Sequence, residues 1–89
     1  MDIRVKRIAD GEFRVTVTEG RSHSSHVVRV SPEEQQRFGG ESTPEELVEQ
    51  SIRFLLERES KEAILQTFDL SVIERYFPEF GEEIGKQLG

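Results

Sequence analysis

Apolar and polar residues alternate along the first thirty residues of the chain. Ile3 and Val5, and after them Phe13, Val15 and Val17, are each followed by a charged or hydroxylated side chain. A period of two is typical of β-strands with one buried face. An Asp-Gly dipeptide between the two runs predicts the turn of a β-hairpin.

The register of this hairpin follows from the requirement that one face of the sheet stay apolar. A three-residue loop over 9–11 places Val5 opposite Val15 and Ile3 opposite Val17, whereas a two-residue loop mixes the faces. The same loop puts a glycine where a left-handed backbone is wanted. We therefore expect the three-residue loop.

A third strand is predicted over 26–30, after a polar loop over 19–25. The face of the sheet opposite the apolar one then carries four basic side chains: Arg4, Lys6, Arg14 and Arg29. Lys6 lies directly across from Arg14 in this register, which is unfavourable by a few tenths to about 1 kcal/mol. An acidic helix, a partner protein or nucleic acid could cover this face, or water and salt could suffice. The four residues are the candidate face for an anion or nucleic acid.

Three sequences of the type Ser/Thr-x-x-Glu, at 31–34, 43–46 and 71–74, predict helix starts with reciprocal capping. The first helix is short, because Gly39-Gly40 follows it. The second covers about 44–59, and its apolar residues occupy more than one stripe, which predicts neighbours on two sides.

The end of the chain is predicted to be helical in pieces. Ser60 caps a short segment, and the last full helix begins near Ser71 and ends at Phe77, before Pro78. Further apolar residues spaced by four continue the pattern for a turn or two: Phe80, Ile84 and Leu88.

These elements predict a single α+β domain over 1–89. A three-stranded antiparallel sheet, formed by a hairpin and a third strand in 1–30, is followed by three to four helices that pack on its apolar face. The helical part covers 31–70, and an acidic, aromatic C-terminal arm covers 71–89.

Composition narrows the setting. The 89 residues include no cysteine, and the N-terminus lacks the apolar run of a signal peptide. No stretch approaches the roughly 18 apolar residues of a membrane span. We therefore expect a soluble cytoplasmic protein with no membrane partner.

Charge is unevenly distributed along the chain. The net charge is −6, yet residues 1–30 carry six bases against four acids, and residues 31–89 carry six bases against fourteen acids. Such asymmetry either marks an interaction surface or lets the two parts attract each other within one chain or across a dimer.

No set of residues in the sequence predicts catalysis. His23 and His26 lack a third metal ligand and are expected to be exposed loop residues. The serines near His23 are neighbours in sequence only, and no nucleophile, base and orienting group can be assembled. We expect no enzyme activity, no cofactor and no metal.

Aromatic side chains gather near the C-terminus among acidic ones. Phe68, Tyr76, Phe77 and Phe80 fall within thirteen residues. These rings either belong to the core or anchor an arm that docks onto another protein or a second copy. Tyr76, Phe77 and Phe80 are the candidate protein-interaction residues.

The strand at 27–30 and the capped helices at 31–34 and 43–55 resemble a ribbon–helix–helix unit. The resemblance implies an intertwined dimer, common among repressors and antitoxins, that reads DNA with the outward side chains of a paired strand. Val27 and Arg29 are the outward positions here, and the helix start at Pro44 would face phosphate.

A second resemblance covers 43–59 and 68–80, with the sequence Phe-Asp-Leu-Ser-Val-Ile-Glu-Arg-Tyr-Phe-Pro-Glu-Phe in the latter. These segments are similar to a group of small bacterial proteins of uncharacterised function. The similarity implies a bacterial origin and brings no activity or site residues.

The expected function is therefore a non-catalytic protein-interaction module that forms a homodimer. A ribbon–helix–helix-like DNA-binding regulator or antitoxin is the first alternative, so nucleic acid ranks below protein as a partner. A small ligand-binding protein or enzyme is the second alternative.

Overall fold

The computed structural model describes residues 1–88 and shows an α+β fold with a four-stranded mixed sheet. The strands are β1 (Asp2–Ala9), β2 (Glu12–Glu19), β3 (Ser22–Arg29) and β4 (Thr67–Asp69), in the order β1-β2-β3-β4. The α-helices are α1 (Pro32–Glu34), α2 (Pro44–Leu56), α3 (Val72–Tyr76) and α4 (Phe80–Leu88). A π-helical turn, η1 (Gln35–Gly39), continues α1, and a 3₁₀ turn, η2 (Lys61–Ala63), follows α2.

The register of the first hairpin is the predicted one. Val5 pairs with Val15 and Ile3 pairs with Val17, so one face of β1 and β2 is apolar. The extra residue lies elsewhere than expected: the loop has two residues, and the register shifts within β1, between Arg7 and Ala9. A bulge in β1 therefore gives the same pairing register that the three-residue loop was expected to give.

Gly11 is required at this turn for two reasons. Its φ is +70°, and a Cβ added there would lie 2.8 Å from the backbone oxygen of Val30. The close approach reflects a hydrogen bond of 2.8 Å in which the Val30 N–H donates to the Gly11 carbonyl. This contact holds the turn against the chain that leaves β3.

The second hairpin replaces the predicted polar loop over 19–25, which was wrong. β2 runs to Glu19, β3 starts at Ser22, and the two pair across a two-residue turn. Gly20 has φ +61° and no other residue of the turn has positive φ, as in a type II′ turn with glycine at its first central position. The first half of β3 was not predicted because serine and histidine occupy it and show no alternation of apolar and polar residues.

β4 is a further difference from the predicted three strands. It pairs with β3 in parallel, with Phe68 beside Val28 and Asp69 beside Arg29. Phe68 and Val28 are buried, whereas Asp69 and Arg29 lie on the open face. The chain thus returns to the sheet between helices, and it sets α3 beside the third strand.

The helix starts depart from the pattern in an informative way. Ser31 forms the predicted capping box with Glu34. Only half of the predicted box forms at Thr43, whose hydroxyl accepts from the Glu46 N–H at 3.1 Å and donates to the Glu46 carboxylate at 3.2 Å. α2 ends at Leu56, before the predicted Glu59. The predicted box at Ser71 was wrong, since its side chain caps nothing. Instead, Glu34 accepts from the Ser31 N–H at 2.8 Å and from the Ser71 N–H at 2.7 Å, and so joins two helix starts.

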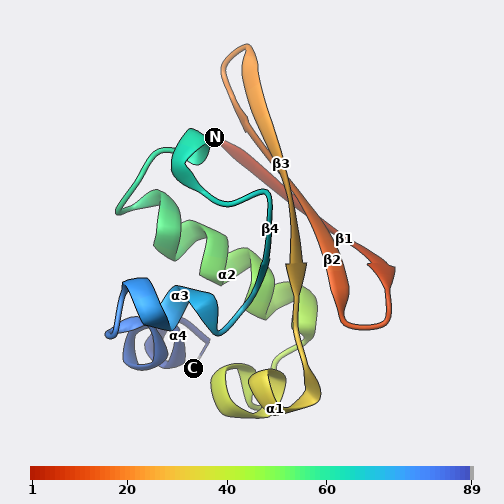
Figure 1. Ribbon diagram of the computed structural model, residues 1–89, viewed down its shortest axis with the longest axis vertical. Helices are drawn as coiled ribbons and strands as arrows, with labels where there is room; N and C mark the ends of the chain where they lie inside the picture. The colour runs from red at the N-terminus through yellow and green to blue at the C-terminus, as the bar shows by residue number, and fades with distance from the viewer. Residues whose placement is uncertain (89) are drawn as a thin grey trace.

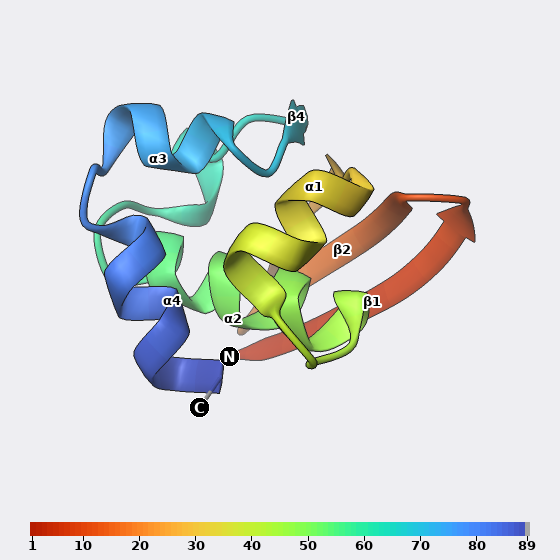
Figure 2. The same ribbon diagram turned by 90° about the horizontal axis from the view of Figure 1, so that it is seen from below.

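All of the helices lie on one side of the sheet (Figures 1 and 2). α2 packs against β1 and β2 with one side and against η1 and α4 with another, as its apolar pattern predicted. The core contains Phe13, Val15, Val17 and Val28 from the sheet, Leu47, Val48 and Ile52 from α2, and Phe80 and Ile84 from α4. The C-terminal segment therefore belongs to the folded body, and the opposite face of the sheet is open.

Candidate functional site

An apolar groove lies where the end of α2, η2, β4 and α3 meet. Its volume is about 330 Å³, and its walls include Leu55, Ile64, Phe68 and Val72. Glu59 is the one charged residue among those that line it. We call this feature the α2–α3 groove.

Two exposed apolar side chains form the rim of the α2–α3 groove. Within residues 1–88, the large apolar side chains that are exposed are Met1, Ile8, Leu65 and Tyr76. Leu65 is 50% exposed and Tyr76 is 69% exposed, and both line the groove. Exposed apolar surface next to a concave apolar wall is typical of a protein-binding surface.

His26 fixes the rim of the groove from the core side. The sequence predicted an exposed loop histidine, which is wrong for His26, since it lies on the apolar face of β3 and is only 2% exposed. Its Nδ1 donates to the Leu65 carbonyl at 2.8 Å, because a carbonyl can only accept, and Nε2 is 2.8 Å from the Ser24 hydroxyl. The backbone of Leu65 is therefore tied to the sheet, which leaves its side chain outside the core.

The three aromatic residues predicted to bind a partner divide between the surface and the core. Tyr76 is exposed, Phe77 is half-buried, and both line the groove. Phe80 is fully buried, with its ring centroid 5.1 Å from that of Phe38 and 5.2 Å from that of Phe54. The interaction set on the surface is therefore reduced to Tyr76 and Phe77.

The sequence missed Leu65 and Glu59 as members of this site. Neither belongs to an aromatic cluster or a motif, and Leu65 precedes a strand that the sequence did not predict. Only the return of the chain through β4 brings the Leu65 segment beside α3.

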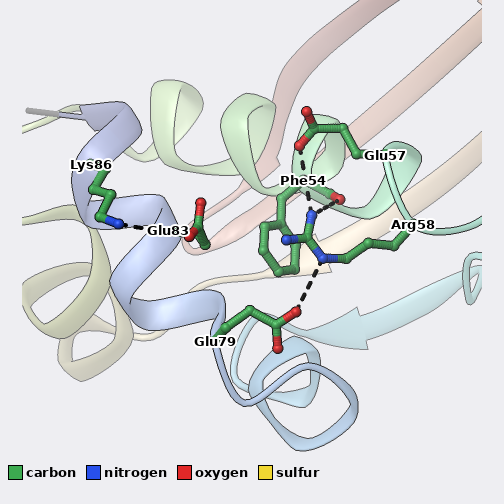
Figure 3. Close-up of polar contacts among 6 residues, drawn as sticks. All are labelled: Phe54, Glu57, Arg58, Glu79, Glu83 and Lys86. Atoms are coloured by element: carbon green, nitrogen blue, oxygen red, sulfur yellow. Dashed lines mark hydrogen bonds and ion pairs between the residues drawn. The ribbon is translucent and has the colours of Figure 1, made fainter.

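The chain segment that supplies most of the groove walls is rich in acidic residues. Residues 57–83 contain eight acids and three bases. Arg58 is engaged within the chain: it lies 3.6 Å from the centre of the Phe54 ring and pairs with Glu79 at 3.3 Å and Glu57 at 3.6 Å (Figure 3). This arginine is therefore already engaged by two carboxylates.

Lys61 is a second engaged base. Its side chain is 4% exposed and contacts the carboxylates of Glu62 and Glu19, the latter at 3.8 Å. The hydrogen bond from Lys61 lowers the pKa of Glu62. The contact of Lys61 with Glu19 ties η2 to the tip of the second hairpin.

The predicted basic face is open to solvent, since the helices cover the other side of the sheet. Arg4 pairs with Asp2 at 2.9 Å, and Arg29 pairs with Asp69 at 2.7 Å. The hydrogen bond to Asp69 raises the pKa of Arg29. Lys6 faces Arg14 across the strands, as predicted. These two form no ion pair among the described residues. Two of the four bases are thus neutralised by neighbours.

The arrangement of β3 differs from that of a ribbon–helix–helix strand. Val27 and Arg29 do point to the open face, but β3 is paired with β2 on one edge and β4 on the other. It has no free edge along 27–29 for the strand of a second chain. The short α1 also departs from the helix that the resemblance implies.

The described part of the chain brings together no group of three or more metal-ligating side chains, and His23 is exposed, away from His26 on the other face. No helix over residues 1–88 is both long and apolar enough to cross a membrane. Comparison of the chain with protein-family models, curated proteins and solved structures finds no match. The geometry of the surface is thus the guide to function.

Proposed function

We propose that this chain is a non-catalytic protein-interaction domain that binds a partner through the α2–α3 groove. The observation that carries the proposal is the position of Leu65 and Tyr76, two exposed apolar side chains on the rim of one apolar cavity. Cytoplasmic location is part of the same proposal, because a cysteine-free chain needs no oxidising compartment.

The energetics of the rim support this proposal. Fully burying a leucine or aromatic side chain is worth about 1.5–3 kcal/mol, so a half-exposed one has roughly 1 kcal/mol still to gain. Tyrosine is also enriched among the residues that dominate binding energy at interfaces. Two such residues around an existing cavity therefore give a partner a well-defined anchor site.

The rim also favours a protein over a small ligand. Small-molecule sites enclose most of the ligand surface within about 300–1,000 Å³. The α2–α3 groove is at the lower end of this range, and the side chains of Leu65 and Tyr76 stand largely outside it. Exposed apolar side chains beside the groove suit a macromolecular surface better than an enclosed ligand.

Partner retention by tagged variants tests the proposal. Wild type, Leu65→Ser and Tyr76→Ala are used to recover partners from a nuclease-treated lysate of the source cell. We expect each groove variant to weaken retention about fivefold or more, from a loss of roughly 1 kcal/mol. Ile8→Ser is the matched control, because Ile8 is a similar side chain, 40% exposed, outside the groove. Equal retention by all four proteins would overturn the proposal.

The homodimer expected from the sequence stays a prediction, and sedimentation of wild type and Leu65→Ser measures it. A dimer that persists in the variant would place the self-contact outside the groove. A dimer lost in the variant would make the second copy the groove's partner.

A nucleic-acid-binding role is the second candidate, supported by the unpaired bases Lys6 and Arg14 on the open face. Its test is binding of duplex DNA by wild type and by Lys6→Gln with Arg14→Gln at several salt concentrations. Steep salt dependence that becomes shallower in the variant would favour it, since each lost phosphate contact reduces the salt slope by about 1. Absence of DNA binding at low salt would rule out the nucleic-acid-binding role.

A further inference from the structure

We infer that the partner segment that fits the α2–α3 groove is a basic amphipathic helix of another protein, with a lysine or arginine placed against Glu59. This inference rests on the proposed function of the groove. It follows from the charge of the groove, the state of the neighbouring bases and the kinds of element that form the walls.

Glu59 is the feature that selects the charge of the occupant. It is half-buried and is the one charged side chain that lines the groove. The ion pairs found within residues 1–88 engage the neighbouring Glu57 and Glu62 but not Glu59. A partner that covered this carboxylate with apolar atoms alone would bury an unpaired charge, which is strongly unfavourable. A cation on the partner removes that cost.

None of the three bases in residues 57–83 forms an ion pair with Glu59, and two of them are engaged by other carboxylates. Arg58 stacks on Phe54 and pairs with Glu57 and Glu79, as Figure 3 shows. Lys61 is buried against Glu62. The Glu59 carboxylate in the wall of the groove therefore has no basic partner among residues 1–88.

This charge argues against a second copy of the chain as the occupant. A symmetric contact through the groove would bring the Glu59 carboxylates of two copies into one interface, and like charges opposed across an interface are unfavourable. A basic segment of a different protein would instead attract the Glu59 carboxylate.

The walls favour a helix over an extended strand. Strand addition gains its affinity from main-chain hydrogen bonds along a free sheet edge. The sheet edge at this site is β4, which has three residues. The remaining walls are side chains from α2, η2 and α3, and such a groove accepts apolar residues at positions i, i+3 or i+4, and i+7 of a helix.

A peptide-display selection tests the inference on the full chain. The probe is a library of random peptides of about 16 residues, enough for roughly four helical turns. We expect the enriched peptides to combine apolar residues at helical spacing with at least one lysine or arginine. Their binding should fall about fivefold or more in Leu65→Ser and about three- to tenfold in Glu59→Gln, which removes one partly buried ion pair. Glu57→Gln is the matched control, because it changes the net charge equally at a residue that does not line the groove.

The outcomes separate the inference from the proposal on which it rests. Peptides that need Leu65 but lack basic residues, or that bind Glu59→Gln as tightly as wild type, would overturn the inference and leave the groove as a binding site. Peptides that bind in an extended form, shown by isotope-edited spectra, would overturn the helical occupant. Peptides whose binding is unchanged in Leu65→Ser would overturn both the inference and the proposed function. A dimer that is lost in Leu65→Ser would show that the occupant is a second copy and not another protein.

Discussion

Replacing His26 by phenylalanine removes the hydrogen bonds that tie the rim of the groove to the sheet. In the native protein the ring is 2% exposed, and its two nitrogens bond to the Leu65 carbonyl and the Ser24 hydroxyl, both at 2.8 Å. Phenylalanine keeps a planar ring at this place but offers no donor. His26→Phe therefore tests whether the contact of β3 with the Leu65 segment is energetically important.

The expected loss follows from the groups left without partners. The hydrogen bond to the Leu65 carbonyl is part-buried, so its loss costs up to the roughly 1–3 kcal/mol of a buried group, and the loss of the Ser24 bond adds about 0.5–1.5 kcal/mol if that hydroxyl finds no water. For a domain of this size, 1 kcal/mol corresponds to roughly 4–8 °C in Tm. His26→Phe is therefore expected to unfold well below wild type.

Urea unfolding and thermal melting measure this loss, and Ser24→Ala separates the smaller contribution. His23→Phe is the matched control, because His23 is exposed on the same strand and its replacement should stay within about 0.5 kcal/mol. The Nδ1 proton of His26 should also exchange slowly in the wild-type nitrogen-15 spectrum. Equal stability of the two phenylalanine variants, or a His26 ring proton that exchanges as fast as one on His23, would refute the reasoning.

Three further predictions concern turns, charge and pH. Gly11→Ala should cost about 1–3 kcal/mol more than Gly20→Ala in urea unfolding, because the new Cβ of Gly11→Ala meets a backbone oxygen at 2.8 Å whereas that of Gly20→Ala meets nothing within 4 Å; equal losses would contradict this. Arg14→Glu should stabilise the protein by up to about 1 kcal/mol at low salt, because it converts a like-charged pair with Lys6 into an ion pair; an unchanged or lower stability would oppose the observed register. The pKa of Glu62 is lowered by the hydrogen bond from its lysine neighbour, so its contribution is present above its unfolded pKa of about 4.3 and is lost as the pH falls through the lower folded pKa. Glu62→Gln should lose stability less steeply than wild type between about pH 5 and 3, as chemical unfolding at several pH values would show.

The sheet was predictable where alternation of side chains carried the information. The pairing of Val5 with Val15 followed from the need for an apolar face, and the structure has that register. The start of β3 was missed because Ser22 to Ser25 offer no apolar alternation, and β4 was missed because three residues are too few for a period of two. β4 also depends on a partner strand about 40 residues earlier, whereas β3 pairs with its neighbour β2.

Helix starts show the same limit of local chemistry. The capping box at Ser31 is complete, because its glutamate lies within reach of the same turn. At Ser71 the local glutamate is not used, because Glu34, 37 residues earlier, takes the backbone N–H. Competition from a distant residue cannot be read from a four-residue pattern.

The candidate site was predictable in part for the same reason. Tyr76 and Phe77 were indicated by a concentration of aromatic residues, but the pattern could not tell that Phe80, three residues later, points into the core. Leu65 and Glu59 were missed because the crossover through β4 alone makes them neighbours of α3. Local sequence identified the aromatic anchors, and tertiary structure supplied the groove.

Site-specific photocrosslinking tests the central claim most directly. A photoreactive amino acid is placed at Tyr76, on the groove rim, or at Thr18, on the open face of the sheet, in the full chain within the source cell. If the α2–α3 groove is the binding surface, position 76 should give a crosslinked partner protein that position 18 does not give. The yield of this product should fall in Leu65→Ser. Crosslinks from position 18 alone, or a product at position 76 that Leu65→Ser leaves unchanged, would contradict the account.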